Sequence, residues 1–477
     1  MFGMILLCAL ALFVAVIAIR TARFTPKAQP EISNEEFSFD KEAATDALVQ
    51  LVKCKTISYN DKSLEDDAEF EKLYALLPQL YPNVFSVCSM EKFPDRALLF
   101  RWPGKTAGEP AILMAHYDVV PVNEEKWDKP PFAAIIEDGI LWGRGTLDTK
   151  VTINGVLSAA NYLIGQGFQP EHDIYFAFSG GEEVSGLGAV NIVDYFASQN
   201  ITPSMVVDEG GAVVENVFPG VKQPCGLIGI AEKGLMNVQY RTLSAGGHAS
   251  APKPHTPVGV LAAACKKVDD HPFKAHIEGP AAQMFDTLGR YSTLLYRVIF
   301  ANLWCFGWVI DLLGKSSGGE MNALVRTTSA FTQMQGSSAR NVIPPEATMV
   351  ANMRLNPADS VASALEYLKK TVGDENVEIT VLEGSEPSRV SRIDCEGWDK
   401  VCAAVAETWK GCIVAPYLMV QCSDSRHYGR ISDKVYRFSA MDLTAEERAT
   451  IHGNNERIRL ETISKAVEFY IRLMKRC

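Results

Sequence analysis

Four apolar or small-residue runs in this sequence each lead into carboxylate or imidazole side chains. The polar residues that follow these runs are, in chain order, His116 with Asp118, then Asp148, then Glu182 with Glu183, and then Asp208 with Glu209. An apolar run such as residues 111–115 is typical of a strand buried in a parallel sheet, and such sheets bind ligands at the carboxyl ends of their strands. These side chains are therefore predicted to emerge at one edge of a sheet.

A second histidine, His452, lies in a polar loop near the C-terminus. Two histidines, two aspartates and a glutamate form a nitrogen and oxygen donor set that suits two divalent metals without any thiolate, and zinc matches it best. A lone His-x-Asp is equally compatible with a core histidine beside a turn aspartate. The repetition of acidic strand ends favours the metal centre.

Composition places the chain among ordinary globular proteins. Its 477 residues predict two or three compact units, and a net charge of −11 without a basic stripe argues against a nucleic-acid surface. The eleven cysteines include no CxxC pair. They are typical of core thiols rather than of a disulfide or zinc scaffold, which favours a reducing compartment.

The N-terminal segment predicts a single-pass membrane anchor over residues 1–20, followed by a tether over 21–39. Residues 1–19 carry no charge, and at about 1.5 Å per residue they span a bilayer core. A cleaved signal peptide is the alternative, but the charged start and a small-residue cleavage site are missing. Arg20, Arg23 and Lys27 flank the segment and would hold the body in the cytoplasm.

The rest of the chain divides by pattern. Residues 40–233 alternate apolar runs and helices, including a helix at 149–164, as in a parallel α/β sheet. Residues 234–384 suit a small α+β domain, with one strand at 323–334, and residues 385–477 resume the first domain. An insertion at 271–320 has an apolar centre at 294–313, which predicts amphipathic helices rather than a second membrane span, because Arg297, Asn302 and Asp311 interrupt it.

Five motifs in order resemble the di-zinc metallopeptidases of the aminoacylase, glutamate carboxypeptidase and carboxypeptidase S type. They are Ala115-His-Tyr-Asp-Val-Val-Pro121, Trp127 with Pro130-Pro-Phe132, Gly143-Arg-Gly-Thr-Leu-Asp148-Thr-Lys150, Gly180-Gly-Glu-Glu-Val-Ser-Gly186 and Ser244-Ala-Gly-Gly-His248-Ala-Ser250. The resemblance implies an α/β catalytic domain, with a mainly parallel sheet flanked by helices, and an inserted α+β lid that dimerises. The segments at 208–211 and 423–428 most resemble the carboxypeptidase S and N-acyl-amino-acid hydrolase branch. That branch is largely secretory or lumenal, so it points to the opposite side of the membrane from the basic flank.

The resemblance also implies roles for the acidic cluster. His116 corresponds to a ligand of one metal and Asp148 to the carboxylate that bridges two zinc ions, for which Co²⁺ or Mn²⁺ are substitutes. Glu183, Asp208 and His452 correspond to the remaining metal ligands. Glu182 corresponds to the general base, and Asp118 to a residue that orients His116 or supports the base, or else merely caps the strand.

The lid supplies the remaining roles by the same resemblance. His248 corresponds to a histidine that stabilises the oxyanion in the partner subunit of a homodimer, and Asn341 and Arg354 to residues that hold the substrate. Arg426 is a weaker candidate, with a structural ion pair as its alternative. These roles imply hydrolysis of an N-acyl amino acid or short peptide with a free α-carboxylate. An aminopeptidase or dipeptidase and a non-catalytic binding module remain the alternatives.

Overall fold

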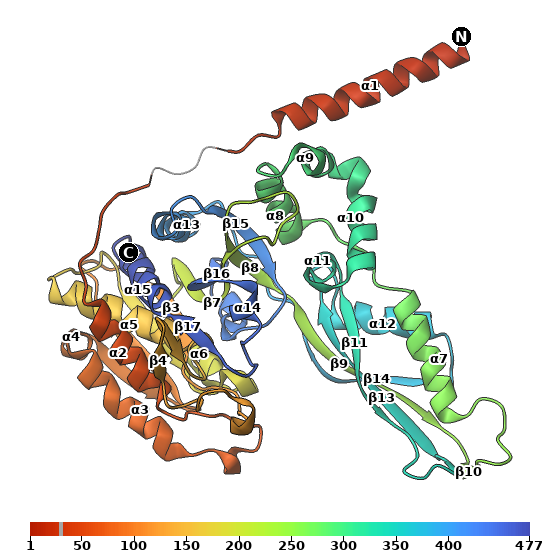
Figure 1. Ribbon diagram of the computed structural model, residues 1–477, viewed down its shortest axis with the longest axis horizontal. Coiled ribbons are helices and arrows are strands. Elements are labelled where there is room, and N and C mark those ends of the chain that lie inside the picture. Colours follow the sequence, from red (N-terminus) through yellow and green to blue (C-terminus); the bar gives the residue numbers. More distant parts are fainter. Residues whose placement is uncertain (28–31) are drawn as a thin grey trace.

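The apolar runs form the centre of an eight-stranded sheet in a computed structural model that describes residues 1–27 and 32–477 (Figure 1). The strands in spatial order are β1 (Ser89–Phe93), β2 (Ala97–Trp102), β6 (Ile174–Ser179), β3 (Ala111–His116), β7 (Met205–Val214), β16 (Val435–Leu443), β8 (Cys225–Glu232) and β15 (Ile413–Met419). The central strands β6, β3, β7 and β16 pair in parallel. However, β1 and β2 add antiparallel pairs at one edge, and β8 runs antiparallel to β16, so the sheet is mixed rather than mainly parallel.

Helices cover both faces of this sheet, which explains the unbroken apolar runs. Along β3, Leu113 and Ala115 join the core under α2 (Lys41–Val52), α5 (Lys150–Gly165), α13 (Glu396–Thr408) and α15 (Leu460–Met474). Ile112 and Met114 join the opposite core under α6 (Gly188–Ser198). Side chains alternate across a strand, so both faces need apolar residues.

The predicted helix at 149–164 is α5, which begins directly after the Asp148 loop and is buried along most of its length. A Cβ at Gly155 would lie 3.0 Å from the ring of Tyr470 in α15. The small residues of α5 thus let α15 pack closely against it.

Smaller elements surround this body. They are α3 (Asp67–Leu80), α4 (Pro82–Val87), α14 (Ala445–Arg448) and a three-stranded sheet of β17 (Arg457–Arg459), β5 (Ile140–Trp142) and β4 (Ile135–Glu137). The pairing of β5 with β17 is antiparallel. It brings the segment before Asp148 beside the segment after His452.

A second, antiparallel sheet lies beside the body (Figure 1). Its strands are β11 (Thr328–Gln335), β13 (Glu346–Leu355), β9 (Gly234–Leu243) and β14 (Glu378–Ser385), with α7 (Pro257–Asp270) and α12 (Val361–Val372) on one face and the short pair β10 (Gly247–His248) and β12 (Val342–Ile343) at its tip. The prediction of a strand at 323–334 was wrong for its first residues. Residues up to Val325 belong to helix α11 (Gly319–Val325), and β11 begins at Thr328.

Part of the expected insertion packs on the large sheet rather than on the second one. Helix α8 (Gly279–Gly289) lies against β15, with Phe285 and Leu288 buried. The apolar centre forms α9 (Leu294–Ala301) and α10 (Leu303–Ser317), which meet at an angle of 114°. The interruption at Asn302 thus falls at the bend.

The N-terminal segment is one helix, α1 (Phe2–Arg23), long and apolar enough to cross a membrane. It projects away from the body in Figure 1. It continues into the first three residues expected in the 21–39 tether, and residues 28–31 of that tether lie outside the described residues.

Candidate metal centre

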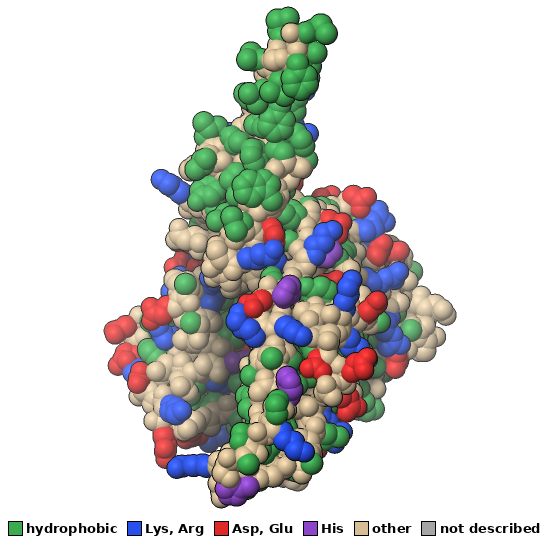
Figure 2. Space-filling model, turned by 90° about the vertical axis from the view of Figure 1, so that its right-hand side faces the viewer, with side chains coloured by type: hydrophobic (Ala, Val, Ile, Leu, Met, Phe, Trp, Pro, Cys, Tyr) green, Lys and Arg blue, Asp and Glu red, His purple; other side chains and the backbone are tan. Residues whose placement is uncertain are grey.

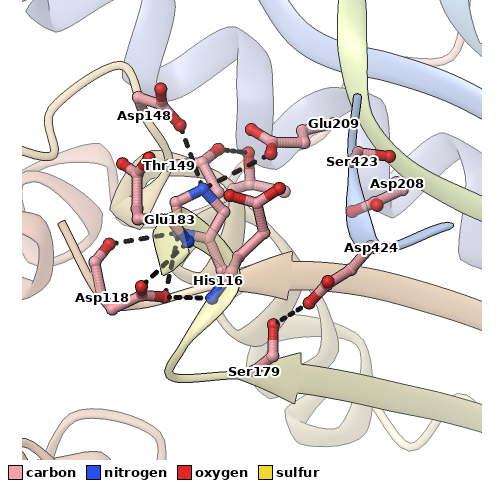
Figure 3. A network of polar contacts seen from close by, with 12 residues as sticks. His116, Asp118, Asp148, Thr149, Ser179, Glu183, Asp208, Glu209, Ser423 and Asp424 are labelled. Atoms are coloured by element: carbon pink, nitrogen blue, oxygen red, sulfur yellow. Dashed lines mark hydrogen bonds and ion pairs between the residues drawn. The ribbon is translucent and has the colours of Figure 1, made fainter. Parts of the chain in front are cut away.

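His116, the last residue of β3, lies buried among carboxylates (Figure 3). Its Nε2 atom is 3.0 Å from Oδ1 of Asp148 and 3.4 Å from Oε1 of Glu209. Burial opposes the protonated ring, yet Glu209, Asp118 and Asp148 together raise the pKa of His116 well above its ordinary value. The surroundings of this nitrogen therefore favour a positive charge.

Asp148 joins His116 to the second histidine. Its Oδ1 atom faces His116, and its Oδ2 atom lies 3.0 Å from Nε2 of His452, which is also 3.0 Å from Oε2 of Glu183. These two carboxylates raise the pKa of His452 to about 10. Asp148 thus lies between the imidazoles of His116 and His452, which are far apart in the sequence.

Further carboxylates crowd the same space. Possible ligand atoms of His116, Asp148 and Glu183 lie within 4.8 Å of one another, and so do those of His116, Glu182 and Glu209. Burial raises the pKa of Glu209 to about 8 and that of Glu182 well above its ordinary value, and neighbouring acids add to both shifts. Buried like charges destabilise one another unless cations neutralise them.

The donor set fits two divalent cations. Oε1 of Glu183 is buried and has no hydrogen-bond partner within the described part of the chain. Imidazole nitrogens and carboxylate oxygens are the ligands of zinc and similar ions. An aspartate whose two oxygens face different histidines suits the position between two such ions.

The family comparison agrees with this geometry. The description "Peptidase family M20/M25/M40" matches residues 112–476, most of the chain. The chain belongs to this family. The prediction of a metallopeptidase is therefore confirmed, and an enzyme is favoured over a non-catalytic binding module.

Two relatives match almost the whole M20 chain. A probable carboxypeptidase S-like 2 of Dictyostelium discoideum is 32% identical over 475 residues, 96% of this chain and 91% of that protein. The N-fatty-acyl-amino acid synthase/hydrolase PM20D1 of Xenopus tropicalis is 33% identical over 480 residues, 98% of this chain and 93% of that protein. An M20 family metallo-carboxypeptidase from Sulfolobus solfataricus shares the fold, with a TM-score of 0.65 at 19% identity over 91% of this chain and 98% of that one.

The acidic pair on β7 departs from the arrangement expected for this M20 chain. Glu209 approaches His116, whereas Asp208 accepts a hydrogen bond of 3.1 Å from the backbone nitrogen of Ser425 (Figure 3). The pairing of β7 with β16 is irregular just after Asp208, where Phe438 pairs with Gly211. The adjacent acids in the sequence identified the pair, but the sequence does not reveal which member points toward His116, because β7 continues to Val214 with an irregular pairing inside the strand.

Asp118 lies behind the cluster. Its carboxylate accepts hydrogen bonds from the hydroxyl of Ser58 at 2.5 Å and from the backbone nitrogens of Glu182 and Glu183 at 3.1 and 3.2 Å. Its Oδ1 atom is also 3.4 Å from Nδ1 of His116. The contacts fit a residue that orients both His116 and the acidic turn, rather than a simple strand cap.

Glu456 is a positioning residue that no motif in the sequence predicted, apart from its place near His452. Its buried carboxylate accepts hydrogen bonds from the backbone nitrogens of Leu147 at 2.7 Å and Asp148 at 3.2 Å, and it pairs with Arg144 at 2.6 Å. Arg144 in turn donates to the carbonyl of Gly453 at 2.6 Å. Glu456 thus connects the loops that carry Asp148 and His452.

The residues expected from the lid fall into two groups. His248 and Asn341 lie together at the exposed tip, where the nitrogen of Ala249 donates to the carbonyl of Asn341, and Figure 1 places β10 far from β3. Arg354, at the end of β13, instead reaches the body, with its guanidinium 3.4 Å from Sγ of Cys422. Arg426 lies beside His427 in the 3₁₀ turn Asp424–Arg430. The structure brings neither His248 nor Asn341 to the cluster of the same chain.

Proposed function

We propose that this M20 enzyme hydrolyses an amide bond next to a free carboxylate, in an N-acyl amino acid or at the C-terminal end of a short peptide. The observation that carries the proposal is the position of Asp148 between His116 and His452, among partly buried carboxylates. The relatives named carboxypeptidase S-like and N-fatty-acyl-amino acid synthase/hydrolase support the substrate class.

Two divalent ions complete this proposal, and we assign them as zinc, with Co²⁺ or Mn²⁺ as substitutes. His116, Asp148, Glu183 and His452 would hold them, together with Asp208 or Glu209 from the β7 pair. When bound, such ions lower the pKa of a water molecule and polarise a substrate carbonyl.

Glu182 is the proposed general base. It takes a proton from the attacking water and passes it to the leaving nitrogen. The support is its place: it lies within the same group as His116 and Glu209, while the adjacent Glu183 contacts His452. One of two neighbouring carboxylates can thus bind metal while the other handles the proton.

Arg354 is the proposed clamp for the substrate carboxylate, since a guanidinium binds a carboxylate through two parallel hydrogen bonds. It projects from the second sheet to Cys422, the residue before Ser423, and Ser425 of this loop donates to Asp208. Arg426 in the same loop is a second candidate. We assign His248 and Asn341 to the active site of a partner subunit in a homodimer that forms through the second sheet.

We also propose that α1 is a single-pass membrane anchor. Its 22 residues have an exposed apolar surface, with Arg20 and Arg23 only in the last turn. At about 1.5 Å per residue the helix matches the thickness of a bilayer core.

Metal analysis and a matched substrate pair test the function. The purified full chain should bind two zinc ions per subunit, lose activity with a chelator and regain it with zinc. It should cleave an N-acyl amino acid much faster than the same compound with its carboxylate amidated. Equal rates on acid and amide would favour an aminopeptidase.

A pair of variants, Asp208→Asn and Glu209→Gln, identifies the remaining ligand. The variant that loses one of the two metals marks the residue that binds it. If both variants keep two metals, neither side chain belongs to the ligand set.

A further inference from the structure

The base of α1 is fastened to the bend between α9 and α10. Nε of Arg20 donates to the carbonyl of Ala301, the last residue of α9, at 3.1 Å. Nδ2 of Asn302, the buried residue at the bend, donates to the hydroxyl of Thr21 at 3.2 Å. The two contacts fix the bend beside the last turn of the apolar helix.

A third contact lies further along α1. The rings of Phe13 and Trp304 meet edge to face with centroids 5.7 Å apart. Phe13 is six residues before Ile19, where the uncharged segment ends, so at about 1.5 Å per residue Trp304 lies alongside α1 roughly 9 Å into that segment. A side chain that contacts Phe13 must lie in the same layer as Phe13.

The surface around Trp304 is apolar and open. The large exposed apolar residues of the two helices are Leu294, Leu295, Trp304, Trp308, Leu312 and Leu313. Trp308 is 64% exposed and Leu295 71%. Figure 2 shows the hydrophobic side chains of α1 continuing onto the upper part of the body. Exposed apolar surface of this kind marks an interaction site.

We propose that the α9–α10 bend enters the same bilayer that α1 crosses and lies in the outer part of one leaflet without spanning it. The inference rests on the proposed anchor, because Phe13 defines the depth of Trp304. Helices of 8 and 15 residues, at about 1.5 Å per residue, are each too short for a span, and they bend by 114°. Tryptophan is the side chain that membrane interfaces favour.

The bilayer explains this surface better than a second copy of the chain does. Trp304 already packs on α1, so a protein partner covering it would have to lie beside the anchor at the same depth. Lipid surrounds α1 there in any membrane. The apolar faces of α1 and of the bend therefore have one continuous occupant.

Tryptophan quenching in proteoliposomes tests this placement. The full chain is reconstituted in phosphatidylcholine that is brominated near the headgroup end of its acyl chains, because bromine quenches tryptophan only at close range. We expect quenching in the wild type and its loss in the double variant Trp304→Phe/Trp308→Phe. The matched control Trp398→Phe/Trp409→Phe removes two buried rings of the catalytic body and should keep the quenching. Both double variants should retain hydrolysis of a water-soluble substrate.

Carbonate extraction of the same samples separates this inference from the anchor. Suppose that wild type and Trp304→Phe/Trp308→Phe are quenched equally while the chain resists extraction. This result would overturn the placement of the α9–α10 bend in the bilayer and leave the anchor intact. Extraction of the chain with the tryptophan-dependent quenching preserved would overturn the span and leave an interfacial contact. A dimer that the double variant abolishes, without lipid quenching, would assign the surface to a second copy and overturn the proposal.

Discussion

The carboxyl edge of the large sheet and the tip of the second sheet each present a histidine, in opposite surroundings. His116 is buried and fixed by Asp118, Asp148 and Glu209. His248 is exposed, and its Nδ1 lies 2.7 Å from the hydroxyl of Ser250. The first histidine already has the partners that a metal ligand needs. The second is presented to the outside, which is the arrangement expected of a group that acts on another subunit.

His116 and His248 contribute to the proposed catalysis in different ways. The charged centre assembles within one chain, because side chains of β3 and β7, of the loop before α5, of the turn after β6 and of the His452 loop converge there. In the proposed mechanism, His248 would donate to the oxyanion of the partner subunit only after two subunits associate. Changes at the edge should therefore act in every subunit, and changes at the tip should act across subunits.

The largest effect is expected at the edge, in Glu182→Gln. Loss of the general base should lower kcat by roughly 10²-fold or more, while both metals and the fold remain. Turnover and metal content measured on one preparation check this, with the exposed Glu375→Gln as the control. Normal turnover in a variant with both metals would remove Glu182 from the mechanism.

The next largest effect is expected at the tip of the second sheet, in His248→Ala. His248→Ala should lower kcat by about 10²-fold, as the loss of an oxyanion donor does. Mixed with Glu182→Gln, it should regain part of the activity, because one site of the mixed dimer would have both wild-type groups.

The control for this mixing experiment is His255→Ala, an exposed histidine of the same region that should stay active. The absence of recovery on mixing, together with a monomeric mass in detergent, would contradict a role for His248 across subunits.

A smaller effect should follow Glu456→Gln, which leaves the ligands in place but loosens the Asp148 and His452 loops. Metal affinity should fall by about 10- to 100-fold, typical of residues that orient ligands. Titration with a competing chelator measures it. Glu407→Gln is the matched control, because Glu407 is a buried glutamate paired with Arg472 and Arg476 away from the site. If both variants weaken metal binding equally, the effect is one of stability alone.

The smallest effect is expected for Arg354→Lys, which keeps the charge but loses the planar fork. KM for an N-acyl amino acid should rise by about tenfold, in line with one weakened charged hydrogen bond, and the slow reaction of its amide should not change. Arg389→Lys, at an exposed arginine, is the control. A parallel change for acid and amide would separate Arg354 from carboxylate recognition.

The sequence predicted those parts of the site that follow from strand ends. His116 and Glu183 lie at or just after the ends of β3 and β6, and the ends of parallel strands meet, so their convergence could be anticipated. Asp148 instead follows β5 of the small antiparallel sheet, so its place beside them depends on the packing of that sheet. The choice between Asp208 and Glu209 could not, because it depends on an irregular strand pairing. Glu456 acts on loops more than 300 residues away in sequence, a contact that local pattern does not contain.

In the fold, too, local pattern predicted some elements, and others depended on long-range packing. Period and composition predicted the strand at 323–334, yet 323–325 formed a helix because Leu324 and Val325 are buried beside α8 instead of pairing in the sheet. The strand β14 (Glu378–Ser385) was not predicted. The direction of β8, antiparallel to β16, also depends on which strands become neighbours. Tertiary packing decides such cases over local propensity.

Contacts beyond the last turn of α1 hold the end of this helix against the body. Phe24 is buried with Phe285 and Phe300, Arg290 lies 4.4 Å above its ring, and Lys27 pairs with Asp286 at 2.9 Å. If α1 is the proposed membrane anchor, these contacts restrict its rotation against the body, so the catalytic edge would keep one orientation and one height above the lipid. In the proposed membrane arrangement, an N-acyl amino acid dissolved in that leaflet would be found by lateral diffusion in two dimensions, and only one whose amide bond reaches that height would be hydrolysed.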